Sequence, residues 1–263
     1  MNRRFFLNRA AVCAASLSFI PRTRSPQHVI FIVNGGGARK KDYYENAALS
    51  PNIHRLAREG FVFEEDHCDC VSSHDAAFYE LIRGRESRTN ASNVPTILDY
   101  VGNGYPTRSL GMIPRILQHY RPRIVVYREM AHDVGHTGFE AYLRAVTATD
   151  EAVGRIFDWV KNHPYFSRNT AIVIRPEFGR DDEVNAHGDL HHSQGFYYTH
   201  RVASIFWGPG FNRGVDKKTV ISRLDMAPTL ARIFNVDASY AQGRVVPGLF
   251  TSPDAPRPPI APG

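Results

Sequence analysis

The chain contains 263 residues, of which 43% are hydrophobic, and its formal net charge at pH 7 is +6. This length allows one α/β domain with a full hydrophobic core and excludes two large domains. The ordinary hydrophobic content argues against a disordered or fibrous protein. The positive charge is scattered, and five of the arginines lie within the first 24 residues. Because no basic stripe alternates with aromatic side chains, the sequence predicts no nucleic-acid partner.

The N-terminus has the features of an export signal. Arg3 and Arg4 precede a short, alanine-rich apolar run at residues 10–20, a pattern typical of a bacterial twin-arginine (Tat) leader. The run is shorter than the ~20 residues of a membrane span, and the alternative is an amphipathic first helix. The sequence therefore predicts a leader at residues 1–27 that engages the Tat export machinery. We expect a periplasmic or secreted protein without stable membrane insertion.

After this segment, apolar runs separated by turn residues predict alternating strands and helices. We expect strands at 28–33, 62–63, 123–127, 171–174 and 203–207, and helices at 51–58, 74–83, 139–160 and 224–234, the last interrupted at Pro228. This alternation predicts an α/β fold with a mainly parallel central sheet flanked by helices on both faces, over residues 28–250. The Pro-rich residues 251–263 are expected to form a disordered tail.

Polar side chains gather where the predicted strands end. Asn34, Asp133 and Glu177 each follow a strand, and ligands of parallel sheets bind just past the carboxyl ends of the strands. Histidines accompany them, namely His132, His136, His187, His191 and His192. Each histidine alone is better explained as a surface or capping residue. As a group with carboxylates, these side chains suit Zn²⁺ or a similar divalent ion.

Two serines stand immediately before a predicted helix. Ser72 and Ser73 precede the helix at 74–83, where unpaired N–H groups and the helix dipole favour an anionic ester. The alternative is an ordinary N-cap serine, which the same position also favours. The two roles are compatible, because a capping serine can also face a bound anion.

Several segments resemble the alkaline phosphatase and sulfatase superfamily and occur in its order. Residues 51–60 (PNIHRLAREG) are similar to the family segment SPNIDRLAAEG, and residues 72–85 are similar to its nucleophile loop, helix and TGR ending. Asp133-Val-Gly-His136 resembles the Asp/His metal motif. Further similar segments are 176–181 (PEFGRD), 208–210 (GPG), 224–231 (LDMAPTLA) and 242–244 (QGR). The resemblance implies an alkaline-phosphatase-like fold over residues 28–250.

The family mechanism implies two metal ions about 4 Å apart that clamp a phosphoryl or sulfuryl group. Carried over by position, Ser73 is the nucleophile and Ser72 is the alternative. Asp133, His136 and either His191 or His192 would hold one ion, with His132 as an alternative to Asp133. Asn34, Glu177 and the serine would hold the other ion, and His187 would bind a metal or the substrate. The resemblance thus implies a hydrolase of phosphate or related sulfate esters in the bacterial cell envelope, with one or two ions per chain, most simply zinc, and a small anionic ester as substrate.

The chain also departs from the family pattern. Asn34 stands where an aspartate is usual, and Phe178 stands where the DHG pair has its histidine. These changes weaken the second ion site and favour, as an alternative, an impaired member that binds a ligand or partner. Residues 177–180 also resemble a Tat-exported branch of the superfamily. Because neither Cys68 nor Cys70 is followed by the Cys-x-Pro-x-Arg pattern, a formylglycine-type sulfatase is not expected. The oligomeric state is not predicted.

Overall fold

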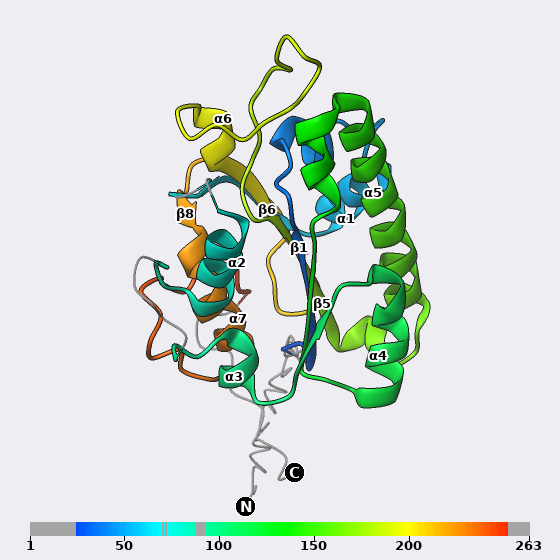
Figure 1. Cartoon of the computed structure of the whole chain (residues 1–263). Coiled ribbons are helices and arrows are strands. Elements are labelled where there is room, and N and C mark those ends of the chain that lie inside the picture. Colours follow the sequence, from blue (N-terminus) through cyan, green and yellow to red (C-terminus); the bar gives the residue numbers. More distant parts are fainter. Residues whose placement is uncertain (1–24, 70, 72, 88–92, 252–263) are drawn as a thin grey trace, which may run out of the picture.

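The computed structural model in Figure 1 describes residues 25–251, apart from residues 70, 72 and 88–92. Nearly all of the predicted leader and tail, and Ser72, therefore lie outside the described residues. Within the described part, none of the helices combines the length and the apolar character that a membrane crossing requires.

A mostly parallel sheet forms the middle of the domain. Its strands lie in the order β3-β4-β1-β5-β6-β2-β7, and β8 pairs with β2. Among these pairs, only those that β6 makes with β5 and β2 are antiparallel. The predicted mainly parallel α/β fold is confirmed. The strands are β1 (His28–Asn34), β2 (Phe61–His67), β3 (Gly104–Thr107), β4 (Ile124–Glu129), β5 (Thr170–Pro176), β6 (Arg201–Trp207), β7 (Gly214–Asp216) and β8 (Ile221–Ser222).

Helices cover both faces of the sheet (Figure 1). The α-helices are α1 (Pro51–Glu59), α2 (His74–Arg83), α3 (Ile97–Val101), α4 (Ile113–Tyr120), α5 (Phe139–Asn162), α6 (Tyr197–His200) and α7 (Met226–Ile233). Short turns of other helix types are η1 (Lys41–Glu45), η2 (Leu110–Met112), η3 (Ala131–Thr137), η4 (Phe166–Arg168) and η5 (Arg223–Asp225). Side chains of β1 alternate between the faces. Ile30 and Ile32 pack towards α1, α4 and α5, whereas Phe31 and Val33 pack towards α2, α3 and α7.

The structure differs from the expected elements at a few places. Pro228 does not interrupt α7, because it is the third residue of that helix, where a missing N–H costs no intrahelical hydrogen bond. Strand β3 was not expected, because its sequence Gly-Tyr-Pro-Thr contains two residues that weaken strands. This strand lies at the edge of the sheet and pairs only with β4.

The topology brings together chain segments that are distant in sequence. Strand β1 pairs in parallel with both β4 and β5, so that Asn34 lies opposite Glu129 on one side and Pro176 on the other. The segments that follow these three strands therefore leave the sheet at the same edge. That edge carries the candidate site.

Candidate metal centre

Four side chains from three segments meet at the carboxyl edge of the sheet. Each of His74, Asp133, His136 and His192 offers one ligand atom, and these atoms all lie within 4.8 Å of one another. We call this group the metal cluster. His74 is the first residue of α2, Asp133 and His136 lie in η3 after β4, and His192 lies in the loop between β5 and α6.

Each histidine of the metal cluster is oriented through its Nδ1 atom. The Nδ1 of His74 contacts the carboxylate of Glu177, and the Nδ1 of His192 lies 2.7 Å from the carbonyl oxygen of Val71. The Nδ1 of His136 lies 2.8 Å from the Nδ1 of His191. Such outer partners fix the tautomer and the ring orientation of metal-binding histidines.

The Nε2 atoms of His74 and His136 point towards one carboxylate. The Nε2 atoms of His74 and His136 lie 3.1 and 3.3 Å from Oδ1 of Asp133. The side chain of Asp133 is 39% exposed, more than those of His74 and His136. The arrangement leaves imidazole Nε2 atoms and a carboxylate facing a common point.

Burial favours the neutral form of two imidazoles of the metal cluster, those of His136 and His192. Desolvation, followed by the charge of Arg180, lowers the pKa of His192 to about 4. The same two causes lower the pKa of His136, against the opposing effect of Asp133. Because a metal-binding imidazole must be neutral, both rings are ready to act as ligands at neutral pH.

A glycine loop after β1 makes room for η3. Gly36 has φ +82°, and a Cβ atom there would lie 2.3 Å from the backbone nitrogen of Asp133. Gly37 has φ +72°, and a Cβ atom there would collide with the ring of Phe178. Glycine is therefore required at both positions, for the left-handed backbone and for the close approach.

The ring of Phe178 packs against two histidines of the metal cluster. This ring is fully buried and lies 5.0 Å from the ring of His74 and 4.7 Å from that of His192. It packs with Cys68 and Val71 in a small apolar cluster. Phe178 thus restricts the orientation of two imidazoles at the position where the resemblance implies a metal-binding histidine.

The donor set fits a divalent ion. Three imidazoles and one carboxylate are a ligand combination that Zn²⁺ accepts, and the number equals its usual coordination of four. The outer partners described above complete a site of this kind. The metal cluster could therefore hold one ion.

The structure separates the remaining predicted ligands from this group. His191 is the hydrogen-bond partner of His136 and is not part of the metal cluster. His192 supplies the ligand atom from this loop. His132 is 2% exposed, and its Nε2 lies 3.1 Å from the hydroxyl of Thr149 on α5. His132 is therefore not part of the metal cluster, and its role as an alternative to Asp133 stays a prediction.

Glu177 and Asn34 do not form a second cluster in the described residues. The carboxylate of Glu177 is fully buried and contacts His74, the backbone N–H of Gly36 at 2.8 Å and the Nη2 of Arg128 at 3.4 Å. Asn34 is 2% exposed, and neither polar atom of its side chain has a hydrogen-bond partner. Because side chains alternate along a strand, Asn34 lies on the same face of the sheet as Ile30 and Ile32, which is the face opposite α2. A second ion would lack a free carboxylate here.

Ser73 and His187 occupy different environments. Ser73 is the N-cap of α2, and its exposed hydroxyl accepts a hydrogen bond from the N–H of Ala76 at 3.3 Å. Ser73 directly precedes His74 in the sequence. His187 lies in an exposed turn stabilised by the Asn185 side chain, and it is not part of the metal cluster. The predicted roles of Ser73 and His187 stay predictions.

Sequence reasoning missed two participants, His74 and Arg180. His74 was expected as the first residue of the helix at 74–83 and was given no ligand role, although its place directly after the two candidate serines was a usable signal. The guanidinium of Arg180 is buried, donates to the carbonyl oxygens of Gly36, Gly37 and Leu190, and lies 3.3 Å from Oδ1 of Asp133. No local sequence pattern identifies such a contact.

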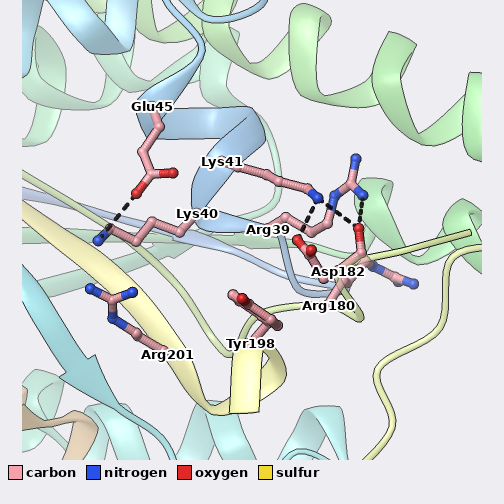
Figure 2. A pocket seen from close by; sticks show the side chains of 8 residues that line it. All are labelled: Arg39, Lys40, Lys41, Glu45, Arg180, Asp182, Tyr198 and Arg201. Carbon is pink, nitrogen blue, oxygen red and sulfur yellow. Dashed lines mark hydrogen bonds and ion pairs between the residues drawn. The ribbon is translucent and has the colours of Figure 1, made fainter. Parts of the chain in front are cut away.

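A basic pocket of about 80 Å³ lies beyond Arg180 (Figure 2). It is lined by Arg39, Lys40, Lys41, Glu45, Arg180, Asp182, Tyr198 and Arg201. Its cations are already paired. Lys41 contacts Asp182, Lys40 lies 3.2 Å from Glu45, and the guanidiniums of Arg39 and Arg201 each bind a carboxylate, of Asp42 and Glu65 respectively. This pairing favours a structural role for the basic pocket.

The chain matches no family model and no curated protein sequence. Solved structures with a similar fold include Ps i-CgsB, with a TM-score of 0.61 and 13% identity over 83% of this chain and 75% of that chain. The same comparison finds Ps i-CgsB in complex with k-i-k-neocarrahexaose (TM-score 0.57, 14% identity, 83% and 75% covered). It also finds BT1596, a 2-O GAG sulfatase (TM-score 0.59, 13% identity, 80% and 71% covered). The chain therefore shares its α/β fold with these solved structures, one of which is a sulfatase.

Proposed function

We propose that the protein is a metal-dependent hydrolase of sulfate or phosphate esters, exported to the cell envelope. The observation that carries this proposal is the metal cluster, in which each histidine has its Nδ1 occupied and a common point remains for an ion. Ser73 is the N-cap of the ten-residue helix α2, whose first residue is His74 of the metal cluster. Twin-arginine export of the folded protein, as the first residues suggest, suits a metalloenzyme.

Each group has a defined task in this proposal. His74, Asp133, His136 and His192 would hold the ion, zinc in the simplest case. On expansion from four to five ligands, the ion would supply Lewis acidity to an ester oxygen. The hydroxyl of Ser73 would lose its proton to solvent as its oxygen attacks the phosphorus or sulfur atom, and the departing alcohol oxygen would take a proton from solvent as its bond breaks. Water would then attack the seryl ester, releasing phosphate or sulfate and restoring the hydroxyl. The N–H groups at the start of α2 favour the negative charge of the transferred group.

The substrate class follows from the fold neighbours and from the anion-binding character of the site. One neighbour is described as a 2-O GAG sulfatase, and another was solved with k-i-k-neocarrahexaose. We therefore infer that sulfate esters of oligosaccharides are the first natural substrates to test, with activated aryl sulfates and aryl phosphates as simple probes.

The test uses three variants of Ser73 with an activated aryl ester. Ser73→Asn keeps an N-cap acceptor but removes the hydroxyl, so turnover should be lost while the thermal stability stays close to that of the parent. Ser73→Ala loses both, and should also lose about 1 kcal/mol of stability. Ser73→Thr keeps both and should retain partial turnover. Full turnover in Ser73→Asn would rule out Ser73 as the nucleophile.

A binding protein without catalytic activity is the second candidate. It is favoured by Phe178 and the paired state of Glu177, which remove ligands that a second ion would use. A zinc-loaded parent that binds sulfate or phosphate but hydrolyses none of the aryl or oligosaccharide esters would support this candidate.

A further inference from the structure

We propose that the site takes a single ion and that Arg128 provides the second positive charge, binding the anionic group of the substrate through its guanidinium. This inference rests on the proposed function. It concerns how the positive charge of the site is divided between an ion and the protein.

The first argument is that the carboxylate of Glu177 already has three partners within the protein. Its carboxylate accepts from the N–H of Gly36, contacts the ring of His74 and pairs with Arg128, and its side chain is fully buried. Its contact with His74 is that of an outer partner, which orients a metal-binding histidine instead of binding the metal. To reach a second ion, Glu177 would have to give up partners inside a buried site.

The second argument is the position of Arg128. It lies near the end of β4, and its Nη1 donates to Oδ1 of Asp75 in the first turn of α2 at 2.8 Å. Its guanidinium carbon lies 4.6 Å from the centre of the Phe78 ring, also on α2. The guanidinium thus lies between Glu177 and the helix start that carries Ser73, where the resemblance implies a second ion.

The third argument is that Arg128 has donors to spare. Its Nε has no hydrogen-bond partner, and a guanidinium has five N–H donors in all. Asp75, which binds its Nη1, has 79% of its side chain exposed, so that pair is weak and easily exchanged for a substrate oxygen. A planar guanidinium fits two oxygens of a sulfate or phosphate group.

Charge balance leads to the same division. One divalent ion faces Asp133, while Glu177 is neutralised by Arg128. A second divalent ion beside the guanidinium would meet a like charge and no free carboxylate, because Asn34 is neutral. The residues therefore do not fit a second ion.

The experiment counts metal ions and measures anion binding without requiring turnover. Zinc per folded chain is determined by native mass spectrometry at saturating zinc, and inorganic phosphate and sulfate are titrated by calorimetry. We compare the parent with Arg128→Gln and Arg128→Lys. The matched control is Arg155→Gln, which changes an exposed arginine on α5 that pairs only loosely with Glu151, at 3.9 Å.

We expect one zinc per chain in the parent and in the control. Anion affinity should fall roughly tenfold to a hundredfold in Arg128→Gln, as expected for the loss of charged hydrogen bonds. It should fall less in Arg128→Lys, which keeps the charge but loses the planar fork, and it should stay unchanged in Arg155→Gln. Binding of a second zinc ion by Arg128→Gln would further support the inference that Arg128 takes the place of a second ion.

Two zinc ions in the parent, or unchanged anion affinity in Arg128→Gln, would overturn this inference. If Arg128→Gln does not fold, as judged by circular dichroism, Arg128→Lys and the zinc count of the parent still decide the question. The proposed function fails separately. A parent with one zinc and Arg128-dependent anion binding, but no ester hydrolysis, would leave this inference standing and sink the hydrolase. Ester hydrolysis by a parent that binds two zinc ions would support the hydrolase and overturn this inference.

Discussion

Arg180 contacts Asp133 of the metal cluster and also lines the basic pocket, and these two sites differ in how their polar groups are satisfied. In the metal cluster, the histidines use Nδ1 for outer contacts and turn towards a shared carboxylate. In the basic pocket, Lys40 and Lys41 already contact carboxylates (Figure 2). Arg39 and Arg201 likewise contact the carboxylates of Asp42 and Glu65. Both sites are rich in ionisable residues. Of the two, only the metal cluster has several metal-ligand atoms directed at a common point that an ion could occupy.

The difference shows that the density of charge is a poor guide to a binding site. A charge that is paired and partly desolvated stabilises the local structure, and recruiting it for a ligand costs the existing pair. Imidazoles held through Nδ1 by outer partners keep those partners when an ion binds at the other ring nitrogen. The following substitutions test this distinction.

The largest effect is expected for Asp133→Asn. It removes the carboxylate that faces His74 and His136, so zinc affinity should fall by more than the tenfold to hundredfold that loss of an outer partner typically costs. Zinc affinity is measured by competition with a chelator. The control is Asp189→Asn, because Asp189 lies in the same loop as His191 but outside the metal cluster. Equal zinc affinities in the two variants would contradict the assignment of the cluster.

A smaller loss of zinc affinity, within the tenfold to hundredfold range, is expected for Glu177→Gln. An amide oxygen can still accept from the N–H of Gly36, but it polarises the ring of His74 less than a carboxylate does. The same chelator competition, performed on protein whose fold is verified by circular dichroism, checks this prediction. Loss of zinc as complete as in Asp133→Asn would instead make Glu177 a direct ligand.

The smallest effect is expected for Lys41→Ala in the basic pocket. Lys41 is 42% exposed and contacts Asp182, so its loss should change the free energy of unfolding by about 0–1 kcal/mol, as for other surface ion pairs. Zinc affinity should not change. Urea unfolding and zinc titration measure the two quantities, and a clear fall in zinc affinity would show that the basic pocket and the metal cluster are coupled.

Much of the fold could be predicted from the sequence. Continuous apolar runs identified β1, β4 and β5, and helical spacing identified α5 nearly to its ends. Because parallel strands end at one edge, the sequence also indicated where the site lies. Helix α4 and strand β3 were missed, since the region before β4 is short and contains proline within both elements.

The composition of the site was harder to predict than its location. His191 and His192 are neighbours in sequence, and only the path of the loop decides that one enters the metal cluster while the other supports His136. The contacts of Glu177 with His74 and Arg128 join residues separated by 103 and 49 positions. Such pairings depend on tertiary packing, so residue types at strand ends suggested ligands but could not separate direct ligands from their outer partners.

The buried guanidinium of Arg180 holds carbonyl oxygens from the loops after β1 and β5 and contacts the carboxylate of η3 after β4. These loops cannot open one at a time without leaving a buried charge short of partners, which is costly. They therefore form a single cooperative unit, whose backbone amides should exchange their hydrogens together. Partial unfolding at this edge would release the ion and expose the arginine in one step, so the site is either fully assembled or absent.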